Sequence, residues 1–330
     1  MKRLVTFKLF GLVMLAGLLL FSSGSAWAQQ MRLNHTFGVN GFLDLAVKEF
    51  AKNVEAKTAG KLTVRVFSAG ELGQELQQYD LMQVGALESA LMGSQVLAAV
   101  APEYNAFELP YIWRDQAHLR SVWDGQIGQE VSEAILSRKG IRIIAALDRG
   151  ARNLTTNNKA VRTPADLAGM KIRTTQNAVH VAAWRALGAI PSPMALGEVF
   201  MALKQGVMDG QENPIDLIAA SSFQEVQKYL MLTQHVRSVA WFGVSEVWFN
   251  RLSDEHRKLI LAEATSAAQW NNKKLAEEEE TILATLSQKM TVIPSKEIDS
   301  AAFRERIKTA AGEFQKVWKP GLVDAITNAK

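Results

Sequence analysis

The most informative segment of the chain runs Pro191-Ser-Pro-Met-Ala-Leu-Gly-Glu-Val-Phe-Met-Ala-Leu-Lys-Gln-Gly-Val-Met-Asp-Gly-Gln-Glu-Asn-Pro214. Its pattern predicts a helix, a short strand and a polar turn that ends in Asp209-Gly-Gln-Glu-Asn-Pro214. Turns that a rigid element holds in place often carry functional residues. We therefore expect this turn to contribute to a functional site.

Strand and helix patterns alternate on the N-terminal side of this segment. Apolar spacing predicts helices over 43–54 and 75–84, and a helix start at Thr163-Pro-Ala-Asp166, where threonine is a good cap and proline a good first residue. Strands are predicted over 31–33, 62–66, 141–147 and 170–174. This alternation predicts an α/β fold with parallel strand pairing.

The C-terminal third is predicted to be almost wholly helical over 254–289, with Ser253 as its cap. We interpret the acidic run 277–280 as a solvated helix face. Single cores seldom exceed about 250–300 residues, so a chain of this length favours two lobes. Because no linker or repeat separates them, we expect the chain to cross between the lobes more than once.

The first 28 residues have the pattern of a secretory signal. Lys2, Arg3 and Lys8 precede a short apolar run over 9–21, and Ala26-Trp-Ala28 is a typical cleavage site. We expect the exported, soluble chain to begin at Gln29. Without the three signal cations the net charge falls from +4 to +1, which argues against a nucleic-acid partner.

Several chemical classes lack support in the sequence. The chain has no cysteine, which excludes thiolate metal sites, thiol catalysis and a lipid anchor at the cleavage site. Its five histidines do not pair at zinc-ligand spacing, and no nucleophile elbow, phosphate loop or dinucleotide fingerprint is present. We therefore predict no metal, no cofactor and no enzyme activity.

Single polar residues at strand ends are the remaining candidates for a binding site. Arg152 and Arg173 each offer a planar fork that matches a carboxylate, although either could be a surface ion-pair residue. Arg173 is the stronger candidate, because ligands of open α/β sheets bind at strand ends. Asn213 precedes a proline and could cap a helix, bind a ligand, or do both.

Two further kinds of residue leave their roles open. His35 follows the first strand and could bond a ligand hydroxyl or serve a structural role in its loop. Trp241, Phe242 and Trp184 could stack on a sugar-like face, but core packing is the commoner role of such aromatics.

Taken in order, these motifs resemble the DctP-type substrate-binding proteins of tripartite ATP-independent periplasmic (TRAP) transporters. The resemblance covers nearly all of the chain after residue 28 and rests on six short motifs and the segment 191–214. The motifs are Phe50-Ala-Lys, Thr58-Ala-Gly-Lys61, Leu72-Gly73, Phe107-Glu-Leu-Pro-Tyr111, Gly150-Ala-Arg152 and Gly169-Met-Lys-Ile-Arg173.

The resemblance implies two α/β lobes with crossing strands and a long hinge helix, closing on one ligand. Lobe I would comprise 29–150 and about 239–278, and lobe II would comprise 151–238 and about 279–330. By the same resemblance Arg173 would clamp the ligand carboxylate, and Arg152 and Asn213 would complete the anion site. Glu75, His35, Gln95, Gln176, Leu196 and Trp241 are the further candidates for ligand contact.

Two departures bear on the identity of the ligand. The sialic-acid-binding members carry an acidic residue where this chain has Gly93-Ser-Gln95, and an aromatic residue where it has Leu196. At position 75, by contrast, this chain keeps an acidic residue, Glu75. The resemblance therefore implies an intact carboxylate end and argues against sialic acid, leaving uronates, aldonates and other hydroxy or oxo acids.

We accordingly expect a periplasmic receptor that delivers a small organic acid to integral-membrane TRAP permease subunits. Two alternatives remain open at this point. The receptor could present its ligand to a membrane sensor, or the chain could be a secreted enzyme.

Overall fold

One mixed sheet runs through the whole molecule. The computed structural model describes residues 29–329, so the expected signal segment 1–28 lies outside the described residues. The strand order is β2-β1-β3-β8-β4-β7-β5-β6, and β9 pairs with β8. The strands are β1 (Gln29–His35), β2 (Leu62–Phe67), β3 (Ser89–Met92), β4 (Ile141–Thr156), β5 (Lys171–Thr174), β6 (Ile190–Pro193), β7 (Gly210–Pro214), β8 (Tyr229–Ser245) and β9 (Thr291–Ile293).

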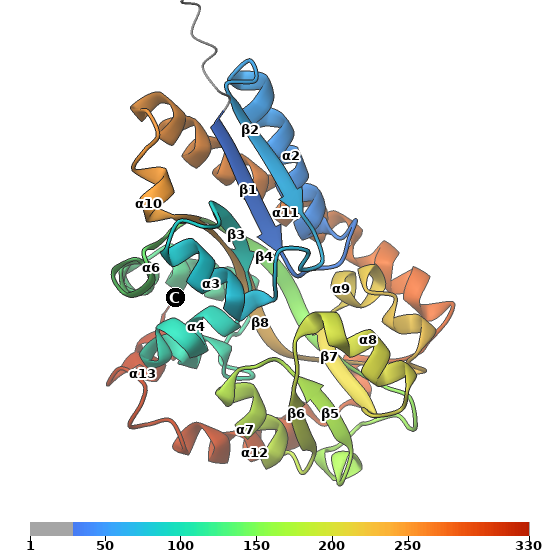
Figure 1. Ribbon diagram of the computed structural model, residues 1–330. Helices are drawn as coiled ribbons and strands as arrows, with labels where there is room; N and C mark the ends of the chain where they lie inside the picture. Colours follow the sequence, from blue (N-terminus) through green and yellow to red (C-terminus); the bar gives the residue numbers. More distant parts are fainter. Residues whose placement is uncertain (1–28, 330) are drawn as a thin grey trace, which may run out of the picture.

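Helices cover the sheet on its outer faces (Figure 1). The α-helices are α2 (Phe42–Lys57), α3 (Glu75–Gln83), α4 (Gln95–Val100), α5 (Gln116–Trp123), α6 (Gln126–Lys139), α7 (Ala178–Ala186), α8 (Leu196–Lys204), α9 (Ile215–Ala220), α10 (Glu246–Phe249), α11 (Asp254–Ser287), α12 (Ser300–Gly312) and α13 (Leu322–Thr327). Short 3-10 helices are η1 (Pro102–Glu108), η2 (Pro164–Leu167), η3 (Phe223–Glu225) and η4 (Ser295–Glu297).

Two long strands cross between the lobes, as the resemblance implied. β4 and β8 pair antiparallel from Ile141 opposite Ser245 to Thr156 opposite Tyr229. At 16 and 17 residues each is roughly 50 Å long. In Figure 1 β1, β2 and β3 lie at one end of this pair, and β5, β6 and β7 lie at the other.

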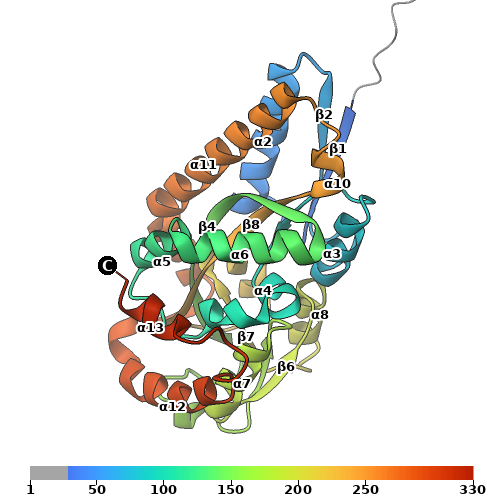
Figure 2. The ribbon, with the colours of Figure 1, turned by 90° about the vertical axis from the view of Figure 1, so that its left-hand side faces the viewer.

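The long helix α11 ties the two ends together. Its 34 residues make it about 50 Å long. It packs on α2 at one end and on α9 toward the other, and it contacts β4 between them. Figure 2 shows it running beside α2 and on past the crossing strands. The two-lobe α/β fold with a long hinge helix is therefore confirmed.

Local patterns predicted most of these elements well. The helix at 43–54 is α2, the strand at 62–66 is β2, and the helix at 254–289 is α11. The Oγ of Ser253 accepts a 3.2 Å hydrogen bond from the backbone N–H of His256, which confirms the predicted cap. The strand at 141–147 is correct in type, but β4 continues to Thr156 because it crosses into the second lobe.

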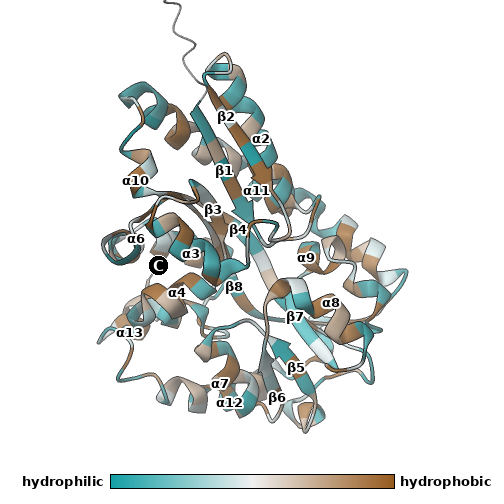
Figure 3. Cartoon of the chain, in the orientation of Figure 1, coloured by the Kyte–Doolittle hydropathy of each residue, from teal (hydrophilic) through white to brown (hydrophobic). Residues whose placement is uncertain are grey.

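The predicted polar turn at 209–214 is wrong. The segment is the strand β7, and all five of its residues are buried although its sequence is polar (Figure 3). The predicted cap role of Asn213 is wrong as well, because Pro214 holds the cap position of α9 and no side chain caps that helix. A polar strand is stable at this depth because its side chains find buried partners on the neighbouring strand.

Candidate functional site

A buried ion pair joins β4 to β7. The Nε of Arg152 donates to one carboxylate oxygen of Glu212, and its Nη2 donates to the other at 2.8 Å and to the Glu212 carbonyl at 2.5 Å. Both side chains are at most 1% exposed. The Nη1 of Arg152 has no hydrogen-bond partner among the described residues. The pair is therefore rigid but leaves one buried donor free.

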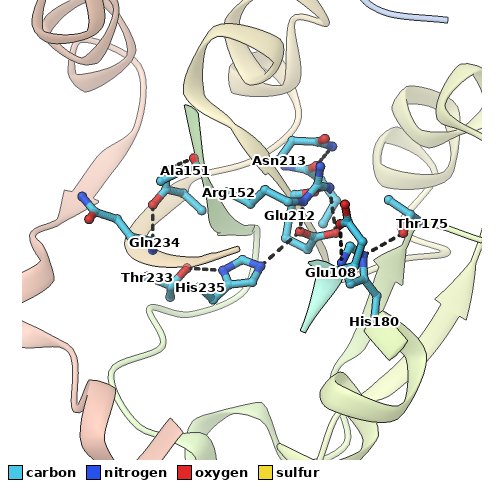
Figure 4. A network of polar contacts seen from close by, with 12 residues as sticks. Glu108, Ala151, Arg152, Thr175, His180, Glu212, Asn213, Thr233, Gln234 and His235 are labelled. Atoms are coloured by element: carbon cyan, nitrogen blue, oxygen red, sulfur yellow. Dashed lines mark hydrogen bonds and ion pairs between the residues drawn. The ribbon is translucent and has the colours of Figure 1, made fainter. Parts of the chain in front are cut away.

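His235 extends this pair along β8 (Figure 4). Its Nε2 lies 3.1 Å from a Glu212 carboxylate oxygen, and its Nδ1 lies 2.7 Å from the Oγ1 of Thr233. Burial raises the pKa of Glu212, but the Arg152 charge and the His235 contact outweigh burial and hold this pKa well below its usual range. Burial lowers the pKa of His235 despite Glu212. Glu212 is thus a charged anchor for Arg152.

Arg173, on β5, has no such anchor. Its side chain is buried, and its Nε (3.0 Å) and Nη2 (2.5 Å) both donate to the backbone carbonyl of Met194. None of the ion pairs between described residues includes it. Burial lowers its pKa to about 10, so the guanidinium stays charged at neutral pH. A buried cation without a protein counter-ion is suited to bind an anion.

Arg149 is a second buried arginine without an ion pair, and sequence reasoning missed it. It is 5% exposed, and its guanidinium carbon lies 5.1 Å from the centre of the Phe37 ring. Burial and the Arg152 charge lower its pKa to about 10. The β4–β8 register shifts between Asp148 and Ala151, which breaks strand alternation. For this reason, the sequence pattern could not show which way Arg149 points.

Glu75 and Gln95 contribute polar groups from the first lobe. One Glu75 carboxylate oxygen accepts hydrogen bonds from the Tyr79 hydroxyl at 2.6 Å and from the Gly93 N–H at 2.7 Å. Burial raises the pKa of Glu75, although Tyr79 and the Arg149 charge act against it. The side-chain oxygen of Gln95 is buried and has no hydrogen-bond partner among residues 29–329.

Asn213 lies on the same side of the sheet as Arg173. Arg173 is paired with Gln211, and strand residues two apart share a face. The amide nitrogen of Asn213 donates to the Gln211 side chain at 2.7 Å. Glu212 lies between them in the sequence and points to the opposite face. The predicted partners Arg152 and Asn213 are therefore held by different networks.

The remaining predicted residues take other positions. The Nε2 of His35 lies 3.0 Å from the Asp44 carboxylate in the first lobe. Trp241 is buried and packs edge-on against Trp123, at 5.8 Å between ring centres. Leu196 is half-buried and touches two core clusters, and Gln176 is exposed and lines an outer cavity. The charges of Arg152, Arg149 and Glu75 all act on Arg173, so these side chains lie near one another. Gln176 and Trp241 instead contact other parts of the molecule.

Other features delimit what this site can do. A surface cavity of about 500 Å³ lies between α6, β4 and α11, and none of the three arginines lines it. Over residues 29–329, no three His, Asp or Glu side chains are grouped so as to hold a metal ion. In the same range, no helix is both long enough and apolar enough to cross a membrane. The charge arrangement favours an organic anion as the ligand.

Comparisons with known proteins show the family to which the chain is similar. Residues 33–317 match the family model for bacterial extracellular solute-binding protein, family 7. The 2,3-diketo-L-gulonate-binding periplasmic protein YiaO of Escherichia coli is 31% identical over 92% of this chain and 91% of its own.

Two solved structures have the same fold. A TRAP periplasmic solute-binding protein from Roseobacter denitrificans, with bound L-galactonate, matches with a TM-score of 0.84 and 32% identity over 91% of this chain and 97% of its own. One from Polaromonas, bound to D-erythronate, matches with a TM-score of 0.86 and 30% identity over 92% and 99%. The relatives are solute-binding proteins rather than enzymes.

Proposed function

Since the chain belongs to the bacterial extracellular solute-binding protein family 7, we propose that it captures a small hydroxy or oxo carboxylic acid between its two lobes. Lobe I comprises 29–150 and about 239–278, and lobe II comprises 151–238 and about 279–330. These limits lie within the crossing strands β4 and β8 and within α11. Closure of the lobes around the solute completes the site.

Arg173 carries the proposal, because it is a buried guanidinium with no carboxylate partner among the described residues. Its two hydrogen bonds to described residues both go to the Met194 carbonyl, so further N–H groups remain for a ligand. A carboxylate there accepts charge-assisted hydrogen bonds and supplies the missing counter-ion. Asn213, on the same face, adds an amide to the anion site.

Arg152 supports this anion site without being free to move. Glu212 neutralises it and fixes its plane, while its Nη1 remains available. Arg149 adds positive charge from the same strand. Together these groups favour one carboxylate over a neutral solute.

Glu75 and Gln95 suit the other end of the solute. Their oxygens are acceptors, so they match hydroxyl donors of an aldonate or a uronate. Leu196 is half-buried and packs against two hydrophobic clusters, and its aliphatic side chain offers no flat face on which a sugar ring could stack. The relatives named above support this class, since L-galactonate, D-erythronate and 2,3-diketo-L-gulonate are carboxylic acids rich in hydroxyl or oxo groups.

We place the mature receptor in the periplasm after removal of residues 1–28. The ligand-bound, closed form then docks on integral-membrane TRAP permease subunits, which fits the family to which the chain belongs. Presentation of the ligand to a membrane sensor is the second candidate role. Genes for two membrane subunits beside this one favour transport, and a gene for a sensor kinase favours sensing.

Calorimetric titration with aldonates, uronates and short hydroxy acids tests the proposal. We expect one member of this class to bind wild type, and Arg173→Gln to bind it about 30-fold to several thousand-fold more weakly, corresponding to about 2–5 kcal/mol. Arg185→Gln is the matched control, because Arg185 is exposed and its ion pair with Glu313 is long, at 4.0 Å. Equal affinity of the Arg173→Gln chain and wild type would refute the anchoring role.

A further inference from the structure

A small surface cavity at the boundary between the two proposed lobes is lined by three arginines and no acidic residue. Its volume is about 140 Å³, and its walls include Arg114, Arg237 and Arg304 together with Tyr111 and Thr233. They come from the loop after η1, from β8 and from the start of α12, segments far apart in the sequence. This cavity contains none of the residues of the solute site proposed above.

The three arginines lack carboxylate partners within residues 29–329. Arg114 is held by the carbonyls of Thr327 and Ala329, at 3.2 and 2.6 Å. Arg304 lies over the Tyr111 ring at 4.6 Å, and its Nη1 is 3.5 Å from the Tyr111 carbonyl. None of the three takes part in an ion pair between described residues, whereas Arg162 and Arg185 do. The cavity therefore carries uncompensated positive charge.

The backbone at two of the residues that line the cavity has an unusual, well-supported conformation. Tyr111 has φ of 62° and Gln234 has φ of 44°, a region that residues other than glycine seldom adopt. The N–H of Tyr111 donates to the carbonyl of His235 at 2.6 Å, and the N–H of Gln234 donates to the Asn153 side chain at 3.1 Å. The backbone at two wall residues of the cavity is thus fixed in place.

The size of the cavity limits its occupant. Cavities for metabolites and cofactors usually measure about 300–1,000 Å³, and one water takes up about 30 Å³. A space of about 140 Å³ fits a single oxyanionic group with a few waters. The planar guanidinium fork can donate two parallel hydrogen bonds to a pair of carboxylate or phosphate oxygens.

We propose that this cavity is a second anion site, which binds one carboxylate or phosphate group between Arg237 and Arg304. The hydroxyls of Thr233, Ser295 and Ser300 line the same space and can donate to the oxyanion. The group is either a free small anion or a glutamate side chain of a docked protein. The inference does not depend on the proposed solute, because the two sites share no residue.

Titration of the full mature chain with inorganic phosphate at low salt tests this site. We expect saturable binding to wild type, and on the order of tenfold weaker binding to Arg237→Gln and to Arg304→Gln. Arg306→Gln is the matched control, since it is exposed on the same helix and does not line the cavity. Each variant should keep the solute-induced melting shift of wild type.

Three comparisons decide the outcome. Equal phosphate affinity for Arg304→Gln and Arg306→Gln overturns the site, and so does loss of phosphate binding in Arg173→Gln, which places the anion between the lobes. Binding of a peptide that contains one glutamate, compared with binding of the same peptide with glutamine in its place, identifies the source of the bound anion. Preference for glutamate assigns a protein carboxylate, and phosphate binding without that preference assigns a free anion. Failure of both probes to bind refutes the proposal.

Discussion

Arg152 and Glu212 form a doubly hydrogen-bonded ion pair across β4 and β7, buried to within 1% of full exclusion from solvent. Two charges at this depth are stable only because each is the counter-ion of the other. The His235 ring adds a further contact to the Glu212 carboxylate. The pair fixes Arg152 close enough to Arg173 for its charge to help lower the pKa of that guanidinium. Its integrity should therefore affect both stability and solute binding.

Glu212→Gln should destabilise the protein by about 3–5 kcal/mol, because it leaves Arg152 charged and buried without a counter-ion. Urea denaturation monitored by circular dichroism measures this loss. The double variant Arg152→Met/Glu212→Leu should recover most of it, since no unpaired charge is left. If the double variant is as unstable as Glu212→Gln, packing rather than charge explains the loss.

Glu212 should also affect how the free energy of unfolding depends on pH below neutrality. Its pKa in the folded protein is well below the ordinary value of 4.5. The stabilisation is therefore complete above about pH 4.5 and is lost as pH falls further. Unfolding free energies between pH 3 and pH 7 should fall less steeply for Glu212→Gln than for wild type.

The matched control for this curve is Glu305→Gln, because Glu305 pairs with Lys308 at the surface with both side chains 73% exposed. That variant should follow the wild-type slope. An identical acid slope for Glu212→Gln and wild type would contradict the assigned role of Glu212.

Asp216 should act in the opposite sense. It is buried in α9, one of its carboxylate oxygens has no partner among the described residues, and burial raises its pKa to about 6. At pH values below 3.8, the ordinary pKa of this group, the carboxyl is neutral in both the folded and the unfolded protein. As pH rises from there to about 6, only the unfolded chain ionises readily, so stability falls.

Asp216→Asn removes this penalty. We expect it to be more stable than wild type at pH 7, by at most about 3 kcal/mol, and nearly equal to it at pH 3.5. Chemical denaturation at the two pH values is the measurement. A gain that is the same at both pH values would show that ionisation of Asp216 is not its source.

The sequence predicts elements better than it predicts partners. The cap at Ser253 and the alternation over 62–66 are local patterns, and both are confirmed. The segment Gln211-Glu212-Asn213 was predicted as a turn because its composition is that of a turn. Its burial depends on Arg152, 60 residues earlier, and on His235, 23 residues later.

The residues of the candidate site were likewise predicted only where local sequence patterns decide their position. Arg173 was a strong candidate because a strand end is visible in the sequence, and the structure buries it there without a counter-ion. Arg149 was missed because a register shift in β4 decides its direction. His35 is the last residue of β1 rather than a loop residue, and only the fold brings it to Asp44. Pairing across strands, rather than local propensity, determines these roles.

Gly38 tests whether closure of the lobes sets the affinity. A methyl group added at Gly38 would lie 2.8 Å from the Cβ of Ala220 at the end of α9, far inside normal contact distance. Gly38 belongs to the proposed lobe I and Ala220 to the proposed lobe II, so the clash separates the lobes. Gly38→Ala should bind solute about tenfold more weakly, because the closed form is less populated.

Small-angle scattering with and without solute measures the separation directly. Gly38→Ala should keep the urea midpoint of wild type but show a larger radius of gyration at the same solute concentration. Gly312→Ala is the control, because a methyl group there meets no atom within 4 Å. Unchanged affinity and an unchanged radius in Gly38→Ala would mean that the loop after β1 yields locally, and that closure does not depend on this contact.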